Sequence, residues 1–565
     1  MGTQVTIDYP VTFPTGAYAY GERSSGERHG VVLTKPHIVD LILDLAGYSV
    51  ERDLGALSLL EPACGRGVFL EAAVQRLVES ARRKGRRVAS LRSAITAFDI
   101  DPEHVAASRA AVAEILRRGG ATEAQADELV RTWITGADFL LVPEHRSFDV
   151  VVGNPPYVRI EQLAPALQVE YRARYESLFD RADLYVAFIE HALNLLSPTG
   201  VLSFICADRW TLNRYGAPLR RMISERFQVR YYIDLHGASP FASEVIAYPA
   251  IFAIGPGPSA EVMVGSLATA DVQECRKFGS AITKAESPQA AMKLAAYKSW
   301  FRGDDPWVLG SPAHLAVLRE LEGKFAPIES DGTTQVGIGV ATGNDSVYIV
   351  GEGADIERDR LVPLVMREDI ENGRIQDGRR FVINTFGPDG KVVDLNAHPR
   401  LSRYLQARVG AVKRRHVARK NPAAWFRTID RVYPELVSRP KLLIPDIAGS
   451  NEVVFDEGRF HPHHNLYIVT SDAWDLEVLG GLLSSRVALF FVWSYAVKMR
   501  GGYLRFQAQY LRRIRLPAPT ALATGLASEI RTAFRRRDFG RLDALALRVY
   551  GLATLPEFDF VDTRK

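Results

Sequence analysis

Two kinds of apolar pattern alternate along the first half of the chain. Apolar residues recur at helical spacing over 37–46, 68–81, 103–118 and 184–196. Between them lie short apolar runs, typical of buried strands, over 57–60, 94–98, 148–152 and 201–206. Strands that alternate with helices predict an α/β fold, a doubly wound and mostly parallel sheet that is covered on both faces. Ligands of such sheets bind beyond the carboxyl ends of the strands.

The alternation ends near residue 260. We expect residues 1–30 to form a loose N-terminal arm and residues 31–260 to form the first domain. Residues 261–310, rich in Gly, Pro, Ala and Lys, are expected to be a connector. The region 311–565 mixes short β-type runs, such as 347–350 and 442–444, with helices such as 477–493. This mixture predicts a second domain of the α+β class.

The composition of the 565-residue chain, 47% hydrophobic and 24% charged, is that of a globular protein with full cores. No apolar run is long enough for a membrane span, and the segment Met1–Pro10 lacks the features of a signal peptide. The 3 cysteines are widely spaced, which excludes a disulfide framework or a four-cysteine zinc site and fits a reducing cytoplasm.

An acidic residue and a Gly-rich turn follow the first predicted strand. Glu61 ends this strand, and Gly65 and Gly67 follow before the next helix. Glycines let a backbone pass close to a ligand that a Cβ atom would exclude. The acid argues against a phosphate and for a cationic group, such as the ammonium of a methionine moiety. A tight strand–helix turn without a ligand would also explain the two glycines.

Acidic residues also follow the next two strands. Asp99 can accept hydrogen bonds from two ribose hydroxyls, with Asp101 as the alternative or as a helix N-cap. Asp138 can accept from an adenine amino group, and Phe139 can form an apolar wall for the ring. Each acid alone could simply cap a helix. Three acids at successive strand ends favour a nucleoside with a positively charged tail.

The strand over 148–152 leads into the segment Gly153-Asn-Pro-Pro-Tyr157. Pro155 and Pro156 lack N–H donors and fix φ near −65°, so the loop is rigid. The amide oxygen of Asn154 and the carbonyl of Pro155 can accept both hydrogens of an aromatic amino group and favour a pyramidal nitrogen whose lone pair is free to attack. Tyr157 offers a face on which an extruded base can stack. A proline-rich turn after a buried strand is the alternative.

Together these motifs resemble the TaqI-like, gamma-class DNA adenine-N6 methyltransferases of bacterial type II restriction–modification systems. The resemblance extends over most of the chain from about residue 30. It implies a Rossmann-like class I methyltransferase domain, S-adenosylmethionine as the cofactor, double-stranded DNA as the substrate and base flipping. The family usually has Glu where this chain has Asp99, which shortens the reach to the ribose by one methylene.

The resemblance also implies roles for individual residues. Phe241 corresponds to the aromatic residue that faces the loop tyrosine across the target adenine, with Tyr248 and Phe252 as alternatives. The catalytic set is thus Asn154, Pro155, Pro156, Tyr157 and Phe241. The segment at Val32 and Thr34 corresponds to one that closes over the cofactor, and the implied cofactor-binding set is Val32, Thr34, Glu61, Ala63, Gly65, Gly67, Asp99, Ile100, Asp138, Phe139, Asn154 and Pro156.

A basic segment lies in the second domain. Between Arg400 and Lys441 there are 12 Lys and Arg residues against two acids, which fits neutralisation of DNA phosphates. A solvated basic helix face is the alternative. Later glycines resemble the closing half of the family's target-recognition domain and could approach a DNA backbone. The predicted DNA-binding residues are Lys413, Arg414, Arg415, Arg419, Lys420, Arg427, Gly501, Gly502 and Arg505.

Three histidines, His461, His463 and His464, lack cysteine or carboxylate partners at ligand spacing. We therefore expect a surface turn there and no metal site.

Methylation of a protein glutamine or of guanine N2 in RNA by the same loop is the main alternative function. A nuclease–methyltransferase fusion and a non-catalytic DNA-binding module are others. Cytosine-C5 chemistry is excluded because it needs a cysteine after a proline, and none of the cysteines follows one. We expect a cytoplasmic, nucleoid-associated monomer without a membrane partner, whose cognate restriction endonuclease acts separately.

Overall fold

The chain divides into two compact units, Met1–Val308 and Leu309–Lys565. The structure is a computed structural model. It describes residues 32–236, 238–242, 248–258, 261–267, 269–283, 294–298, 300–308, 310–376, 379–448, 452–496 and 504–558.

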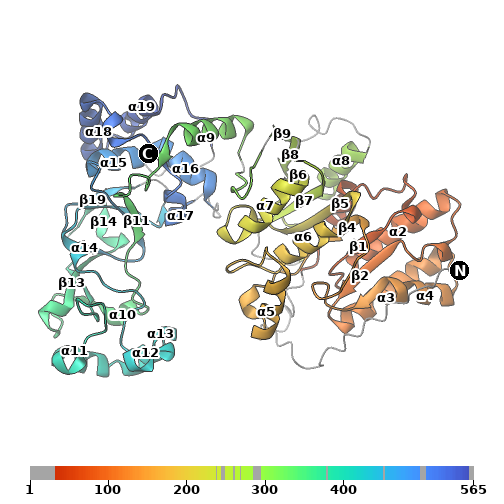
Figure 1. Cartoon of the computed structure of the whole chain (residues 1–565), viewed down its shortest axis with the longest axis horizontal. Coiled ribbons are helices and arrows are strands. Elements are labelled where there is room, and N and C mark those ends of the chain that lie inside the picture. The colour runs from red at the N-terminus through yellow and green to blue at the C-terminus, as the bar shows by residue number, and fades with distance from the viewer. Residues whose placement is uncertain are drawn as a thin grey trace. The chain divides into compact units, whose positions relative to one another are not determined.

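One sheet organises the first unit, with the strand order β3-β2-β1-β4-β5-β7-β6-β8-β9 (Figure 1). The first five strands in this order are parallel, and β7 runs antiparallel to both of its neighbours. The strands are β1 (Leu59–Glu61), β2 (Ile95–Asp99), β3 (Ile134–Gly136), β4 (Phe148–Gly153), β5 (Leu196–Ala207), β6 (Phe227–Asp234), β7 (Pro249–Pro256), β8 (Glu261–Ser266) and β9 (Ala295–Lys298).

Helices cover this sheet, and nearly every position of β1, β4 and β7 is buried, as both-sided coverage requires. The helices α8, α1, α2, α3 and α4 contact one another in that order, whereas α6 and α7 pack on β5 and β6. The predicted doubly wound sheet is confirmed. The helices are α1 (Pro36–Leu45), α2 (Val68–Arg83), α3 (Pro102–Arg118), α4 (Glu123–Trp133), α5 (Pro165–Arg174), α6 (Tyr185–Asn194), α7 (Ala217–Arg226) and α8 (Val272–Thr283).

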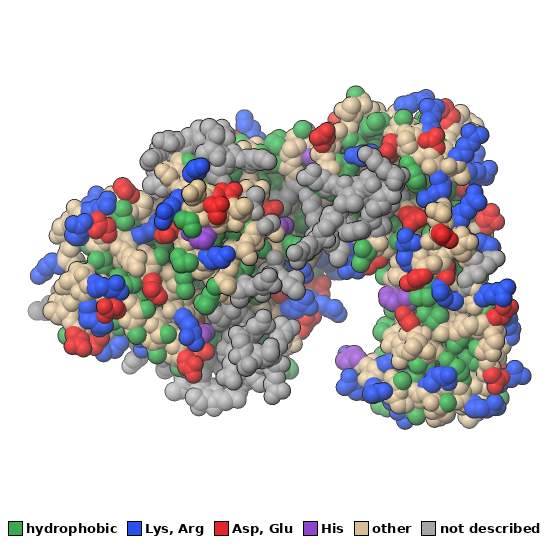
Figure 2. Space-filling model, turned by 180° about the vertical axis from the view of Figure 1, so that it is seen from behind, with side chains coloured by type: hydrophobic (Ala, Val, Ile, Leu, Met, Phe, Trp, Pro, Cys, Tyr) green, Lys and Arg blue, Asp and Glu red, His purple; other side chains and the backbone are tan. Residues whose placement is uncertain are grey.

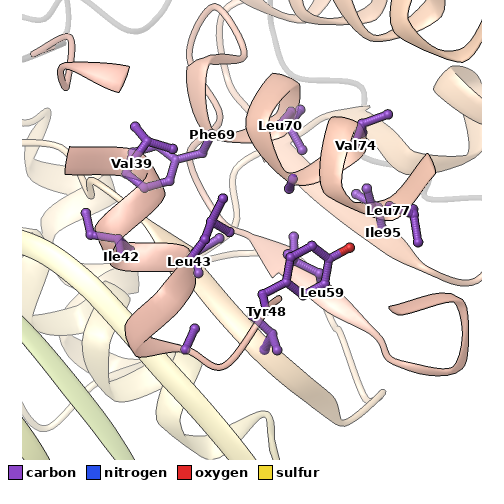
Figure 3. Close-up of a cluster of buried hydrophobic side chains, with 14 of the residues drawn as sticks. Val39, Ile42, Leu43, Tyr48, Leu59, Phe69, Leu70, Val74, Leu77 and Ile95 are labelled. Atoms are coloured by element: carbon purple, nitrogen blue, oxygen red, sulfur yellow. The ribbon is translucent and has the colours of Figure 1, made fainter. Parts of the chain in front are cut away.

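The core beneath α1 and α2 fixes the first strands in place. Figure 3 shows Val39 and Leu43 of α1 and Leu70 and Val74 of α2 gathered over β1, where Leu59 is fully buried. Burying side chains of this size stabilises the fold by about 1.5–3 kcal/mol each. This packing fixes the positions of the ends of β1 and β2, and therefore also those of the residues that follow these strands.

Two of the longer segments differ from the expectation. The segment 261–310 is not the simple connector that we expected, because in its described part β8 pairs with β6, β9 pairs with β8, and α8 packs on α1. The helix expected over 477–493 is two helices, α15 (Leu476–Leu483) and α16 (Arg486–Tyr495), bent by 60°. The Ser485 hydroxyl accepts from the Ala488 N–H and so starts a new helix, which apolar periodicity alone does not reveal.

The described residues of the second unit form two four-stranded sheets, in the orders β11-β21-β17-β19 and β12-β16-β13-β20. Three two-stranded pairs accompany them, β10-β23, β14-β15 and β18-β22. The strands are β10 (Ala326–Pro327), β11 (Gln335–Ile338), β12 (Ile349–Gly351), β13 (Leu361–Val365), β14 (Ile370–Glu371), β15 (Arg374–Ile375), β16 (Arg380–Ile383), β17 (Lys441–Pro445), β18 (Ile447–Ala448), β19 (Val454–Asp456), β20 (His461–Pro462), β21 (Leu466–Thr470), β22 (Leu504–Arg505) and β23 (Arg515–Leu516).

Helices and sheets occur together in this unit, which confirms its mixed α+β character. The β-type run expected over 347–350 is half helical, since α10 includes Val347 and Tyr348. Besides α15 and α16, the helices are α9 (Pro312–Lys324), α10 (Asp345–Tyr348), α11 (Pro399–Gln406), α12 (Val409–Lys413), α13 (His416–Lys420), α14 (Glu435–Ser438), α17 (Ala508–Leu511), α18 (Thr524–Arg536) and α19 (Phe539–Tyr550).

Within the described residues, no single helix has the length and apolar character needed to cross a membrane. The bent pair α15 and α16 meets that test only when the two helices are taken together. Almost all of their apolar side chains are buried within the second unit, where α15 packs on α18.

A fully buried ion pair joins β17 to β19. The Lys441 ammonium lies 2.8 Å from an Asp456 carboxylate oxygen, and both side chains are 0% exposed. The ammonium also donates to the carbonyls of Leu436 and Arg439, while Asp456 accepts from three backbone N–H groups of the turn that follows it. The positive charge of Lys441 is thus paired with the negative charge of Asp456. Removing either side chain would leave the other charge buried without an opposite charge beside it.

Replacing Lys441 with Met should lower the free energy of unfolding by about 3–5 kcal/mol, because it leaves the Asp456 carboxylate buried and unpaired. Denaturant unfolding of the full chain, followed by far-UV circular dichroism, measures the change. The control is Arg439→Met, which removes a partly exposed ion pair with Asp472 and should change stability by less than about 1 kcal/mol. Equal effects of the two substitutions would contradict the prediction.

Candidate active site

A pocket opens at the carboxyl ends of β1, β2, β3 and β4 and encloses about 960 Å³, its open mouth included. Every predicted cofactor-binding residue lines it except Gly67. Gly67 precedes α2 with a φ of +95°, and a Cβ atom there would lie 3.2 Å from the Ser108 Cα. Its role is the close packing of the turn against α3 rather than direct contact with the pocket.

Glu61 lies at the base of the pocket. Its side chain is buried, and one carboxylate oxygen, Oε2, has no hydrogen-bond partner among the described residues. Burial, together with the nearby Asp99 carboxylate, raises the pKa of Glu61 well above its usual value. An acid held in this way favours a cationic partner, which would supply both the missing hydrogen bond and the compensating charge.

The turn after β1 orients Asp99 at the end of β2. The Gly65 N–H donates to Asp99 Oδ2 over 2.8 Å, and the Asp101 N–H donates to Oδ1 over 2.9 Å. A carboxylate has about four acceptor positions, so Asp99 can accept further hydrogen bonds from a ligand. Asp101 instead caps α3 by accepting from the Glu103 N–H, which is the alternative role that its position before a helix suggests.

His104 was not predicted, yet it lines the pocket beside both acids. Its Nδ1 lies 3.3 Å from Asp99 Oδ1, and its Nε2 lies 3.9 Å from Asp101 Oδ2. The only signal in the sequence is its place in the first turn of α3, three residues after Asp101. That spacing puts the imidazole on the same side of the helix as the acids.

Asp138 follows β3 and is less available than expected. Its Oδ1 accepts from the Leu140 N–H over 2.9 Å, and its Oδ2 accepts from the Tyr171 hydroxyl of α5. Burial, the largest influence, raises the pKa of Asp138. Phe139, which we expected to form an apolar wall for the ring, is buried and packs among aromatic rings, with the Phe188 centroid 5.5 Å away. The contact with Tyr171 comes from a separate helix, so strand-end patterns could not reveal it.

The end of β4 presents a free hydrogen-bond acceptor. The Asn154 amide nitrogen donates to the Val32 carbonyl over 3.0 Å and to the Thr34 hydroxyl over 3.3 Å. These two bonds fix the orientation of the amide. The amide oxygen, Oδ1, is buried and has no partner among the described residues. An oriented, unpaired acceptor is suited to a ligand that brings an N–H donor.

Tyr157 and Phe241 lie together beside this acceptor. Their ring centroids are 6.3 Å apart at an interplanar angle of 84°, an edge-to-face arrangement. Phe241 forms a β-bridge with Thr34, and the Lys35 N–H donates to the Pro240 carbonyl, so the segment before α1 is joined to this region. The Tyr157 hydroxyl is buried without a partner among the described residues, and burial raises its pKa well above the usual range.

The other two aromatic candidates pack against other residues. Phe252 is buried within β7 and packs against Trp210 and Tyr232, so it belongs to the core. Tyr248 contacts the His236 ring, at a centroid distance of 5.1 Å. Of the three aromatic residues considered, the structure brings Phe241 into contact with Tyr157. Pro155 is buried, and Pro156 lines the pocket.

The basic segment of the second unit forms short helices, α12 and α13, joined at Arg415. Lys413, Arg414, Arg419 and Lys420 are exposed there. Figure 2 shows Lys and Arg side chains gathered at the end of this unit where Figure 1 labels α11, α12 and α13. These four residues are placed where a phosphate could reach them.

Arg415 is placed differently from the expectation. Its guanidinium donates to the carbonyls of Val412, Thr342 and Arg427 and to the Tyr348 hydroxyl. Burial, the largest influence, lowers the pKa of Arg415. Because these protein groups take up its donors, Arg415 holds the segment together rather than presenting its charge to a phosphate. Counting charges along the sequence cannot separate the two roles.

Two further predicted DNA contacts also have partners within the protein. Arg427 donates to the carbonyls of Thr428 and Ile429, and Arg505 forms an ion pair with Asp446. Gly501 and Gly502 lie outside the described residues.

The sequence matches two known protein families. Residues 88–241 match the Eco57I restriction-modification methylase family, and residues 396–516 match the TaqI-like C-terminal specificity domain. The fold and the matched regions define a methylase with an attached specificity domain. The chain belongs to the type II DNA methyltransferases of restriction–modification systems.

Individual relatives extend over almost the whole chain. It is 44% identical to the type II methyltransferase M.BstVI of Geobacillus stearothermophilus, over 93% of this chain and 96% of that protein. It is also 44% identical to M.PaeR7I of Pseudomonas aeruginosa, over 93% and 92% respectively. Among solved structures, the type IIL restriction-modification enzyme MmeI in complex with DNA shares the fold, with a TM-score of 0.56 at 14% identity over 92% of this chain and 73% of that one.

The raised pKa of Glu61 predicts a pH-dependent penalty in the ligand-free protein. The pKa of Glu61 is higher in the folded chain than in the unfolded chain. Above a pH of about 4.5 the unfolded chain therefore loses this proton while the folded chain still holds it, and the free energy of unfolding falls as the pH rises through the folded pKa. Glu61→Gln removes this loss. The variant should become more stable than the wild type as the pH rises from 5 to 8, by about 1–2 kcal/mol at the upper end.

Thermal unfolding of the ligand-free protein across this pH range measures the difference. Glu176→Gln, at an exposed position on the same unit, is the matched control and should follow the wild type. A Glu61→Gln curve parallel to that of the wild type would show that the carboxylate carries no such penalty.

Proposed function

We propose that the protein transfers a methyl group from S-adenosylmethionine to N6 of an adenine that is flipped out of double-stranded DNA. The first unit, from about residue 31, is the catalytic domain, and the second unit is the target-recognition domain. The protein acts as a monomer on host DNA in the cytoplasm, and a separate restriction endonuclease cuts unmodified sites. Membership of the type II DNA methyltransferases supports DNA rather than protein glutamine or RNA as the substrate.

The pocket residues fit S-adenosylmethionine. The unpaired Glu61 carboxylate would bind the ammonium of the methionine moiety, and Asp99 would accept from the ribose hydroxyls. Ile100 is 44% exposed at the pocket wall, and Phe139 lies deeper, so both offer apolar surface to the adenine ring. When bound, this cofactor supplies an electrophilic methyl group on a positively charged sulfur.

Asn154 carries the proposal. Its amide nitrogen is held by Val32 and Thr34, so its unpaired oxygen faces an incoming amino group in a fixed orientation. Accepting a hydrogen bond from the adenine N6, together with the Pro155 carbonyl, reduces conjugation of the nitrogen lone pair with the ring. The nitrogen then becomes a better nucleophile, and the acceptors stabilise the positive charge that develops on it during transfer.

Tyr157 and Phe241 would hold the extruded base. The two rings meet edge to face, so one ring can stack on the adenine while the other contacts its edge. The bridge between Phe241 and Thr34 ties this base site to the segment that also holds Asn154. The segment of Val32 and Thr34 therefore positions both the aromatic pair that would hold the base and the acceptor oxygen of Asn154.

Asn154→Ala should reduce the rate of methyl transfer by at least about 100-fold, since it removes an oriented acceptor that acts on the developing charge. Binding of S-adenosylmethionine and of DNA should remain within a few-fold of the wild type. Single-turnover transfer of tritiated methyl to duplex DNA, with separate calorimetric binding measurements, checks both. Asn194→Ala, at an exposed site in the same unit, is the control and should transfer at the wild-type rate.

Digestion of the product DNA to nucleosides identifies the methylated atom. N6-methyladenine supports the proposal, whereas methylcytosine would refute the adenine assignment while leaving DNA methylation intact. An Asn154→Ala variant with wild-type transfer would refute the mechanism.

Neutralising the four exposed basic residues Lys413, Arg414, Arg419 and Lys420 to Gln should weaken DNA binding uniformly across sequences. It should also reduce the slope of log K against log salt by about 0.9 for each phosphate that the protein no longer neutralises. Fluorescence anisotropy with labelled duplexes at several salt concentrations measures the slope. Neutralising four exposed basic residues of the first unit, Arg82, Arg83, Arg117 and Arg118, provides the control. Equal slopes for both sets would contradict a specific role for α12 and α13.

A further inference from the structure

Three side chains from two segments of the second unit that are far apart in the sequence converge at the start of α10. His463 Nε2 lies 3.1 Å from Asp345 Oδ2 and 2.9 Å from His464 Nδ1. One ligand atom from each of the three residues lies within 4.8 Å of the others. Asp345 is 118 residues away from His463 in the sequence, which explains why the histidines appeared to lack a carboxylate partner.

The expected surface turn is therefore only partly right. His463 is buried, with a side-chain exposure of 3%, whereas His464 is exposed and the Asp345 side chain is 42% exposed. His461 does not take part, because its ring is buried elsewhere, with Nδ1 3.0 Å from the Pro462 carbonyl and Nε2 accepting from the Tyr433 N–H. Only two of the three histidines belong to the cluster.

The backbone holds the cluster in place independently of any ligand. Val340 pairs with His463 in a β-bridge, the His464 N–H donates to the Val340 carbonyl, and the Val340 N–H donates to the Pro462 carbonyl. The Thr342 hydroxyl donates to Asp345 Oδ1 and so orients the carboxylate. The three side chains are thus brought together by the fold, as a preformed site requires.

Protons alone do not satisfy this arrangement. A proton on His463 Nε2 can point at Asp345 or at His464, but not well at both, and without that proton Nε2 faces the carboxylate lone pairs. A cation between the three ligand atoms would satisfy all of them at once. Tetrahedral zinc with bonds of about 2.0–2.1 Å needs ligand atoms about 3.3 Å apart. The two separations from His463 Nε2, 3.1 Å and 2.9 Å, are a few tenths of an ångström shorter than this, and the ligand atoms of Asp345 and His464 lie within 4.8 Å of each other.

We propose that Asp345, His463 and His464 bind a divalent transition-metal ion, with Zn²⁺ as the ion best matched by two imidazoles and one carboxylate. Solvent completes the coordination on the exposed side. The ion has a structural role, because it joins the first residue of α10 to the turn between β20 and β21. The site lies in the second unit and takes no part in methyl transfer.

The test uses the tag-free, full-length protein, stripped with EDTA, incubated with Zn²⁺ and then freed of excess ion. Inductively coupled plasma mass spectrometry should find about one zinc per chain, as a single three-residue site implies. Zinc should also raise the melting temperature, because a ligand bound only by the folded state stabilises it. Substituted Co²⁺ should give visible absorption bands of a low-symmetry site.

His464→Ala and Asp345→Asn should each lose most of the bound zinc and the rise in melting temperature, while circular dichroism stays unchanged. Both side chains are accessible to solvent, so these variants avoid disturbing the buried His463. His416→Ala, at an exposed histidine of α13, is the matched control and should keep the zinc. Absence of zinc from the wild type, or full retention by both His464→Ala and Asp345→Asn, would overturn the proposal.

Discussion

The amide of Asn154 is the group on which the rest of the site depends. Its nitrogen is held by Val32 and Thr34, which precede α1, so its oxygen is presented as a buried acceptor without a partner among the described residues. The same short segment pairs with Phe241 and thereby positions the aromatic residues beside the acceptor. A primary amide has distinct donor and acceptor ends, and fixing the donor end determines which way the acceptor points. The two bonds to the amide nitrogen of Asn154 therefore fix the direction in which its oxygen can accept a hydrogen bond.

Glu61 follows the same principle with a full charge. An unpaired buried carboxylate destabilises the ligand-free protein, whereas the buried hydrophobic cluster around β1 stabilises it (Figure 3). A ligand that brings a cation relieves the penalty and gains binding affinity in doing so. Asp99 differs, because backbone N–H groups already bond to both of its oxygens. The pocket therefore contains one acid without a hydrogen-bond partner at one of its oxygens, Glu61, and one acid that backbone N–H groups hold in position, Asp99.

Much of this arrangement could be predicted from local sequence. Strand ends, Gly-rich turns and the proline-stiffened loop after β4 are encoded within a few residues, and parallel strands bring their carboxyl ends to one edge of the sheet. For that reason local patterns suffice to place Glu61, Asp99 and Asn154 in one pocket. They do not reveal the partition of a long apolar segment into α15 and α16, because a helix break at Ser485 depends on a single cap. Local sequence patterns therefore predict the turns after strands better than they predict a break within a helical segment.

What could not be predicted depends on contacts between residues far apart in the chain. The Tyr171 hydroxyl, which belongs to α5, donates a hydrogen bond to an oxygen of Asp138. The Arg415 guanidinium donates to the backbone carbonyls of Thr342 and Arg427 in its own unit. In both cases the residue type was right for the expected task, but tertiary packing assigned its hydrogen bonds elsewhere. Asp345 and His463 show the converse, since packing supplies a carboxylate to a histidine that seemed to lack one. A polar side chain acquires its function from the partners that folding leaves available to it, and those partners are set by the topology of the whole unit.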